Sequence, residues 1–288
     1  AGNPVLAKPA EQSPLTAHLA VTILHEAGVP GDCLQLLPGG GEIGQMLVAD
    51  GRIKGVLFTG SNETAWAIQK ALAARRGALI PFIAETGGIN AMIADSTALP
   101  EQVVRDCVRS AFDSAGQRCS AARVLYVQQE IAPRVIELLI GAVEALDLGD
   151  PLDMATDIGP VIEEAAQDAI EAHKLRMSRA HKTLVDPPLP VHCRPGIFVT
   201  PAIYEVSGIA DIGSEVFGPV LHVVRYAGDG LDDVIRAINA SGYGLTLSLH
   251  SRLDAVAEYV AEHARVGNLY VNRNQIGAVP GVQPFGGE

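Results

Sequence analysis

Short apolar runs alternate with helix-like segments through the first ninety residues, and this alternation restricts the fold more than any other feature of the sequence. The runs lie at 5–7, 33–37, 55–58, 80–84 and 90–94. Between the first two, Ser13-Pro14 supplies a helix N-cap followed by proline. Leu15, Leu19 and Ile23 then recur every four residues. This β-α-β-α-β order predicts a parallel, doubly wound sheet with ligand sites at the carboxyl ends of its strands.

The remaining residues continue the α/β pattern with longer elements. Helices are predicted at 100–114, 131–145, 160–179, 231–241 and 253–265. Strands are predicted at 124–128, 220–226, 245–250 and 268–272. The stretch 186–196 contains four prolines, so an irregular surface loop is expected there.

Composition excludes several classes of protein. The 33 acidic and 21 basic residues give a net charge of −12, which argues against nucleic-acid or anionic-membrane partners because both bind basic surfaces. The mean hydropathy is +0.22, yet no apolar run approaches the roughly 18 residues that a membrane span needs. The first residues, AGNPVLAKP, lack the basic start and cleavage site of a secretory signal. A cytoplasmic protein is therefore expected.

The four cysteines are too few and too scattered for a disulfide scaffold, and no Cys-x-x-Cys pair is present. A reducing compartment follows from this pattern. Cys33, in a predicted strand, and Cys107, in a predicted helix, are expected to be small core residues. Cys193 lies in the proline-rich stretch and is expected to be exposed. With His192 alone beside it, no metal site is expected.

Cys119 lies in the segment AGQRCSA and differs from the other cysteines in its surroundings. Its small neighbours let a substrate carbon approach the sulfur. The adjacent Arg118 supplies a cation of the kind that lowers a thiol pKa from its usual value of about 8.5. Because lone cysteines are usually core residues, the residue alone leaves that alternative open.

Glu85 follows an apolar run and precedes Thr86-Gly87-Gly88. A carboxylate at the end of a buried strand is poorly solvated, which raises its pKa towards values suited to a general base. The glycines allow backbone to approach a ligand closely. A loop or helix cap is the alternative interpretation of this residue by itself.

Thirty-four positions separate Glu85 in AETGG from Cys119 in GQRCSA, and this pair of motifs resembles the aldehyde dehydrogenase superfamily. Further motifs follow that superfamily's order: KPAEQSP at 8–14, LFTGS at 57–61, EVFGP at 215–219 and QPFGG at 283–287. AFDSAGQRCSA, EVFGPVLHVVRY, INASGYGLTLSLH and GNLYVNRN resemble most the pyrroline-5-carboxylate (glutamate semialdehyde) dehydrogenase branch, above all the dehydrogenase module of bacterial proline utilization A. Pro280 stands where this branch has valine, and 179–196 matches none of its patterns.

The resemblance implies an aldehyde-dehydrogenase-like α/β fold in three parts. Residues 1–85 would form a partial Rossmann-type NAD-binding domain, and 86–272 the catalytic domain. Residues 273–288 would form a substrate-anchoring loop and the start of a return segment. In this fold Cys119 is the implied nucleophile and Glu85 the implied general base.

The resemblance also implies roles in binding NAD. Lys8 and Glu11 would bind the adenosine ribose, and Gly60 and Ser61 would open a helix facing the pyrophosphate. Glu215 would bind the nicotinamide ribose, with Phe217 packed against it. Without the resemblance, Lys8 and Glu11 are ordinary charged residues after a strand, and Gly60 and Ser61 form a turn. Glu215 is then a surface carboxylate and Phe217 a core aromatic residue.

For the substrate, the resemblance implies a site made mostly of backbone donors. Ser120 and the N–H groups of Gly277 and Ala278 would hold an α-carboxylate, and Phe285 would line the aliphatic part. Glycine at 277 removes the Cβ that would block such an approach. The alternative for Gly277 and Ala278 is an ordinary turn, and the alternative for Phe285 is a core aromatic residue.

The implied reaction is NAD-dependent oxidation of L-glutamate γ-semialdehyde to glutamate in proline catabolism, through a thiohemiacetal and a thioester on Cys119. Two alternatives stay open: an aldehyde dehydrogenase for another aldehyde, and a non-catalytic aldehyde-dehydrogenase-like module for oligomerisation or tunnel sealing. Both ends look truncated, and the family's asparagine oxyanion donor would lie upstream, so the 288-residue piece alone is expected to be inactive. The expected partners are a small aldehyde substrate, a fused upstream proline dehydrogenase and further copies in a homo-oligomer.

Overall fold

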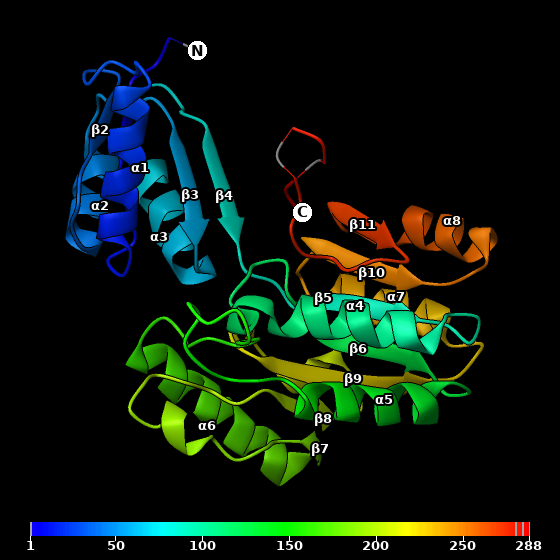
Figure 1. The fold of residues 1–288 in the computed structure, drawn as a ribbon. Coiled ribbons are helices and arrows are strands. Elements are labelled where there is room, and N and C mark those ends of the chain that lie inside the picture. Colours follow the sequence, from blue (N-terminus) through cyan, green and yellow to red (C-terminus); the bar gives the residue numbers. More distant parts are fainter. Residues whose placement is uncertain (1, 280, 284, 288) are drawn as a thin grey trace. The chain divides into compact units, whose positions relative to one another are not determined.

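The computed structural model describes residues 2–279, 281–283 and 285–287, which fall into two compact units, 1–86 and 87–288. Figure 1 shows the elements of each unit in chain order. Pro280, where the sequence comparison expects valine, lies outside the described residues. Among the described residues, no helix has the length and apolarity needed to cross a membrane.

In the first unit, the described residues form two small parallel sheets. The strands are β1 (Val5–Ala7) paired with β2 (Leu34–Leu36), and β3 (Val56–Gly60) paired with β4 (Phe82–Thr86). The helices are α1 (Pro14–Glu26), α2 (Gly41–Ala49) and α3 (Asn62–Ala73). The prediction of a single doubly wound sheet is therefore wrong for these strands. Apolar runs locate strands, whereas pairing depends on lateral contacts that the order of elements does not determine.

Burial in the first unit is lower than the sequence predicts. Leu15, Leu19 and Ile23 lie on α1 as expected, but their side chains are exposed. The predicted buried strand at 80–84 is β4, in which Ile83 is 54% exposed. Among the described residues of this unit, the buried apolar side chains are Val48 and Ala65.

In the second unit, the described residues form a seven-stranded sheet in the order β11-β10-β5-β6-β9-β8-β7. Its strands are β5 (Asn90–Ala94), β6 (Ala122–Gln128), β7 (Lys182–Val185), β8 (Ala202–Glu205), β9 (Val220–Tyr226), β10 (Thr246–His250) and β11 (Asn268–Val271). Neighbouring strands are parallel except β7, which runs antiparallel to β8. β5 is buried along its whole length, as expected for a central parallel strand covered on both faces.

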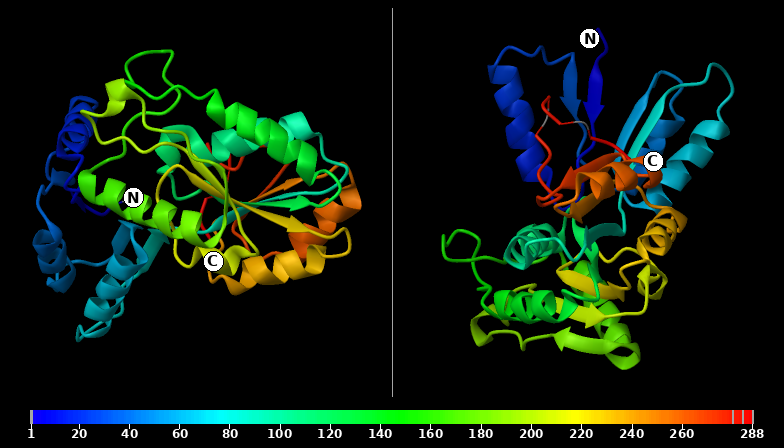
Figure 2. Two further views of the ribbon diagram at one scale, coloured as in Figure 1. Left: turned by 90° about the horizontal axis from the view of Figure 1, so that it is seen from below. Right: turned by 90° about the vertical axis from the view of Figure 1, so that its right-hand side faces the viewer.

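Helices cover both faces of this sheet. They are α4 (Pro100–Phe112), α5 (Ala132–Glu144), α6 (Glu164–Ala180), α7 (Leu231–Ala240) and α8 (Asp254–His263). Figure 2 shows α4 and α5 on one face and α6 and α7 on the other. The predicted strands at 90–94 and 220–226 are β5 and β9, which confirms the α/β class.

The proline-rich stretch 186–196 is irregular and largely exposed, as predicted, except for one buried residue. It follows β7, precedes β8 and contains a short 3-10 turn at Val191–Cys193, and neither strand is predicted from the sequence. Cys193, expected to be exposed, is buried, and its thiol donates to the Leu148 carbonyl at 3.5 Å.

The other two structural cysteines give one correction and one confirmation. Cys33, expected in the core, is exposed in the turn before β2. Cys107 is buried in α4 as predicted, and burial raises the pKa of its thiol to about 12. A thiol in that environment is inert at neutral pH.

Candidate active site

Cys119 lies on a tight turn between α4 and β6, and the side chain of Asn90 fixes this turn. The Asn90 carboxamide donates to the carbonyls of Cys119 (2.7 Å) and Ala121 (3.0 Å). Its oxygen accepts from the Thr246 N–H at 3.1 Å. Asn90 is buried, so these bonds satisfy backbone groups that water does not reach. The turn leaves Cys119 half-buried.

The chain enters this turn through an unusual backbone conformation. Ser114 and Ala115 have φ values of 57° and 53°, which non-glycine residues rarely adopt, and Gly116 follows at 67°. A Cβ at position 116 would lie 2.2 Å from the Gly218 carbonyl oxygen. Glycine is therefore required here, both for its conformation and for the close approach of a second loop. Such local strain is concentrated at functional sites.

Glu215 and Phe217 lie on that second loop, which precedes β9. Glu215 is 18% exposed and its carboxylate lies 3.6 Å from the buried Arg123 guanidinium. A Cβ on Gly87 would lie 1.6 Å from a Glu215 carboxylate oxygen, so the Glu215 side chain in this position occupies the space beside Gly87. Phe217 is 43% exposed, so its ring is not part of the core.

The segment after β11 is attached to the cysteine turn by Gln275. The Gln275 carboxamide is fully buried and donates to the Ser120 carbonyl (3.3 Å) and the Thr246 hydroxyl (3.2 Å). Gly277 follows with φ of +74°, a conformation that glycine adopts without strain. Gln275 therefore ties the predicted substrate loop, which includes Ala278, to the nucleophile turn. Ser120 itself is buried.

Phe285 lies further along the same segment and is 52% exposed. The two glycines after it pack against the backbone at the start of β10 and β11. The Gly286 carbonyl accepts from the Asn268 side chain at 3.0 Å, and a Cβ on Gly287 would lie 2.9 Å from the Gly244 carbonyl oxygen. This close contact requires glycine at 287, and a φ of 128° favours glycine at 286.

In the first unit, Lys8 and Glu11 follow β1. The Lys8 ammonium donates to the carbonyls of Pro9 (2.7 Å) and Gly39 (3.0 Å) and lies 3.5 Å from the Glu11 carboxylate. A backbone hydrogen bond, and after it the charge of Lys8, lowers the pKa of Glu11. The Glu11 carboxylate therefore keeps its charge at neutral pH, which suits hydrogen bonding to hydroxyl groups.

Gly60 and Ser61 connect β3 with α3. Gly60 is the last residue of the strand, and Ser61 is the N-cap, whose hydroxyl accepts from the Thr64 N–H at 3.2 Å. Other N–H groups of this first turn point beyond the helix, where an anion is favoured. Glu85 lies one residue before the end of β4 and is half-buried. Because Glu85 belongs to the first unit, its pairing with Cys119 stays a prediction.

Four residues of the second unit hold the site together and were not singled out from the sequence: Asn90, Arg123, Thr246 and Gln275. Asn90 lies two residues after the glycine pair that follows Glu85, and Arg123 comes four residues after Cys119. A buried polar side chain at the start of an apolar strand is the sequence signal that marks Asn90, Arg123 and Thr246. Gln275 carries no such signal.

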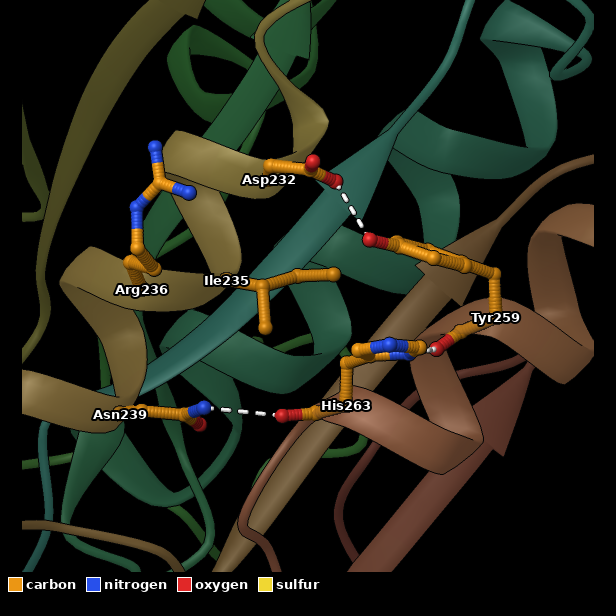
Figure 3. A pocket seen from close by; sticks show the side chains of 6 residues that line it. All are labelled: Asp232, Ile235, Arg236, Asn239, Tyr259 and His263. Carbon is orange, nitrogen blue, oxygen red and sulfur yellow. Dashed lines mark hydrogen bonds between the residues drawn. The ribbon is translucent and has the colours of Figure 1, made fainter.

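A groove between α7 and α8 lies apart from these residues (Figure 3). In it the Tyr259 hydroxyl donates to Asp232 at 2.7 Å, and Asn239 donates to the His263 carbonyl at 2.9 Å. The six side chains that line it include none of the predicted site residues. In the part of the chain that the structure describes, no group of three or more His, Cys, Asp or Glu side chains could hold a metal ion.

Comparison with known proteins gives the family. The model of the aldehyde dehydrogenase family matches residues 1–288, and the chain belongs to that family. It is 52% identical over its whole length to the bifunctional protein PutA of Klebsiella aerogenes, of which it covers 23%. It is 35% identical to 1-pyrroline-5-carboxylate dehydrogenase of Geobacillus kaustophilus, covering 56% of that protein. The chain thus spans less than a quarter of the first relative and little more than half of the second.

Solved structures agree with the sequence comparisons. A crystal structure of bifunctional proline utilization A superposes with a TM-score of 0.97 at 55% identity, over 100% of this chain and 29% of that one. A 1-pyrroline-5-carboxylate dehydrogenase from Thermus with bound NAD superposes with a TM-score of 0.91 at 33% identity, over 100% and 56% of the two chains. The predicted aldehyde-dehydrogenase-like fold is confirmed.

Proposed function

We propose that the protein containing this chain oxidises L-glutamate γ-semialdehyde to glutamate, with Cys119 as nucleophile, Glu85 as general base and NAD as cofactor. The observation that carries the proposal is the Asn90-held turn that presents a half-buried Cys119 beside the Glu215 loop. The similarity to proline utilization A and to 1-pyrroline-5-carboxylate dehydrogenase supports the substrate. The relative from Thermus, which is described with bound NAD, supports the cofactor.

The donor set fits a dinucleotide. The N-terminus of α3 with its Ser61 cap suits a pyrophosphate, and the Lys8–Glu11 pair suits ribose hydroxyls. Glu215, packed against the space that Gly87 leaves open, would accept hydrogen bonds from the second ribose. When bound, NAD+ supplies a hydride acceptor, and Phe217 would restrict its ring. These roles are part of the proposal.

In the proposed reaction the Cys119 thiolate attacks the aldehyde carbon, and the new C–S bond converts the carbonyl into an oxyanion. The backbone N–H of Cys119 would stabilise this oxyanion. Loss of hydride from the same carbon then leaves a thioester. Glu85 removes a proton from water, the resulting hydroxide attacks the thioester, and Cys119 leaves as thiolate. The product is a carboxylate.

Substrate selection would depend on the segment that Gln275 attaches to the cysteine turn. The N–H groups of Gly277 and Ala278 and the hydroxyl of Ser120 would bind the α-carboxylate, and Phe285 would contact the aliphatic carbons. A site built to hydrogen-bond one group discriminates strongly against analogues that lack it. Selectivity for an aldehyde that carries an α-amino acid group follows from this arrangement.

We also propose that the parent polypeptide carries a proline dehydrogenase upstream, forms homo-oligomers and acts in the cytoplasm. The chain covers only 23% of a relative that is described as bifunctional, which supports a second activity elsewhere in the polypeptide. A product aldehyde passed on from proline oxidation would be the substrate of this site.

Steady-state kinetics test the proposal. The protein with its natural flanking sequence, and the 288-residue chain alone, are assayed with NAD+ and with glutamic, succinic and betaine aldehydes. We expect kcat/KM for glutamate semialdehyde to exceed the others by more than about a hundredfold, and Cys119→Ala but not Cys33→Ala to abolish turnover. Preference for another aldehyde would point to a different dehydrogenase. No turnover, with Cys119 alkylated no faster than Cys33, would indicate a non-catalytic module.

A further inference from the structure

The Arg123 side chain lies between the cysteine turn and the loop that carries Glu215, and it is 1% exposed. It is the second residue of β6 and the first polar residue after the nucleophile turn. A fully buried guanidinium is costly unless its donors are satisfied and its charge is paired. The groups that the Arg123 guanidinium contacts therefore indicate its role in the site.

The two terminal nitrogens of Arg123 contact both loops. One donates to the Gly218 carbonyl at 3.0 Å and the other to the Arg118 carbonyl at 3.2 Å. The second nitrogen also lies 3.6 Å from the Glu215 carboxylate. The guanidinium carbon lies 5.5 Å from the centre of the Phe217 ring. The planar fork of arginine can make these contacts at once, whereas a lysine ammonium at the end of a flexible chain cannot.

Two histidines, His173 and His222, link Arg176 to the backbone carbonyl of Arg123 through hydrogen bonds. Because the first donor and the last acceptor of this series are known, the ring nitrogens that carry protons can be assigned. The Arg176 guanidinium can only donate, so its 3.1 Å contact makes Nδ1 of His173 an acceptor. His173 then donates from Nε2 to Nε2 of His222 at 3.0 Å, and His222 donates from Nδ1 to the Arg123 carbonyl at 2.8 Å. Burial lowers the pKa of His173 to about 4 and that of His222 to about 3. Both imidazoles are therefore neutral at pH 7, as the assignment of one donor and one acceptor nitrogen on each ring requires.

The Arg123 guanidinium donates to the carbonyl of Arg118, the residue directly before Cys119, so its positive charge lies beside the cysteine turn as well as beside Glu215. Burial lowers the pKa of Arg123, while the charges of Glu215 and Cys119 oppose that shift. Arginine nevertheless stays protonated in proteins. The charged groups around the turn include Arg123 from β6, Glu215 from the loop before β9, and Arg118 on the turn itself. Arg118 donates to the Ser114 hydroxyl at 3.1 Å, and its charge also acts on Asp113 at the end of α4.

We propose that Arg123 is a positioning residue that holds the Glu215 loop in register with the cysteine turn and supplies the buried positive charge that favours the Cys119 thiolate. This inference rests on the proposed function, because Glu215 and Cys119 have their cofactor and nucleophile roles from it. It adds a residue that neither touches the reacting atoms nor binds the cofactor, but couples the two loops that do.

Two substitutions separate the role of Arg123 in holding the Glu215 loop from its role in supplying positive charge. Arg123→Gln removes the charge and most of the fork. Arg123→Lys keeps the charge and removes the fork, and it also serves if the glutamine variant fails to fold. Lys174→Met is the matched control, because Lys174 is likewise a buried cation, paired with Asp186 at 3.0 Å, but contacts neither loop. All are made in the protein with its natural flanking sequence.

The readouts are the KM for NAD+ and the pH profile of Cys119 alkylation by iodoacetamide, with the exposed Cys33 as internal reference. For Arg123→Gln we expect alkylation at pH 7 to fall about tenfold, which corresponds to a thiol pKa raised by about one unit, and the KM for NAD+ to rise about tenfold. For Arg123→Lys we expect alkylation within about twofold of wild type with a raised KM. Glu215→Gln should shift the alkylation profile in the opposite direction to Arg123→Gln. Lys174→Met should lower only the melting temperature.

One outcome contradicts the inference when the wild-type protein turns over NAD+ and its Cys119 is alkylated rapidly. In that outcome both Arg123 variants keep the wild-type alkylation profile and KM for NAD+ and lose only stability. The inference is also wrong if Lys174→Met changes the two readouts as strongly. A failure of the proposed function looks different: wild-type Cys119 itself would then react no faster than Cys33 and support no NAD-dependent turnover.

Discussion

The two units place their chemically important residues at opposite ends of their strands. In the first unit Lys8 follows β1, Gly60 ends β3 and Glu85 lies next to the end of β4, all at carboxyl ends. In the second unit Asn90 and Thr246 are the first residues of β5 and β10. The Cys119 turn likewise precedes β6, and the Glu215 loop precedes β9.

This difference corresponds to two ways of building a site. At the carboxyl end of β3 in the first unit, the strand leads directly into α3, whose N-terminal N–H groups face outwards and suit an anion. At the amino ends in the second unit, backbone carbonyls of a tight turn need donors, and buried carboxamides such as Asn90 and Gln275 provide them. The first arrangement suits a phosphate-bearing cofactor, whereas the second fixes a nucleophile.

The largest expected effect separates the two proposed catalytic residues, Cys119 and Glu85, one from each unit. Cys119→Ala should abolish hydride transfer and hydrolysis together, because no covalent intermediate forms. Glu85→Gln should slow turnover by about 10²–10⁴-fold but leave a burst of NADH, because only the hydrolysis of the thioester needs the base. Rapid-mixing absorbance at the NADH band measures both. A Glu85→Gln variant without a burst, or with normal turnover, would contradict the division of roles.

A smaller loss is expected when the cysteine turn is released while the nucleophile stays. Asn90→Ala removes donors to two buried carbonyls, so we expect destabilisation of about 2–3 kcal/mol and a roughly hundredfold lower kcat. Asn239→Ala is the matched control, because its carboxamide also bridges backbone groups, at 2.9 Å and 2.8 Å, but far from the turn on α7. Urea unfolding and steady-state kinetics measure the two effects. Equal losses of kcat in both variants would show that Asn90 has no special role.

Acid should affect the second unit through its buried histidines. Burial lowers the pKa of His250 to about 4, as it does for His173, while that of His222 falls to about 3. Unfolded histidine titrates near 6.5, so between about pH 6.5 and pH 4 the unfolded state binds more protons than the folded state. The free energy of unfolding is therefore fully retained above about pH 6.5 and falls as the pH falls. The slope is up to about 1.4 kcal/mol per pH unit for each histidine.

Urea unfolding between pH 7.5 and pH 4.5 measures this slope. His250→Gln should reduce the slope of unfolding free energy against pH by the contribution of about one proton. His263→Gln, at an exposed position on α8, should leave the slope unchanged. Stability that rises on acidification, or a slope unaffected by His250→Gln, would contradict the burial argument.

The same contrast explains which features the sequence predicts and which it does not. β5 and β9 match their predictions because both consist mostly of apolar residues, and the Cys119 and Glu85 motifs are short and local. The pairing of strands in the first unit is not local, and there the prediction of one sheet fails. The Asn90, Thr246 and Gln275 bonds join residues far apart in sequence, such as the 155 positions between Gln275 and Ser120. No periodicity or motif reports such a contact, and buried Cys193 shows that proline content alone does not predict exposure.

The smallest expected effect tests the helix start in the first unit. Ser61 caps α3 through its bond to the Thr64 N–H, whereas Ser13, at the same position before α1, makes no capping bond with its side chain. Ser61→Ala should therefore cost about 1 kcal/mol and raise the KM for NAD+ a few-fold, since the cap orients the first turn. Ser13→Ala should change neither, because there is no bond to lose. Thermal unfolding and NAD+ titration of both variants give the comparison. Equal effects at the two serines would mean that the α3 cap has no part in cofactor binding, and that the carboxyl-end site depends on the strand ends alone.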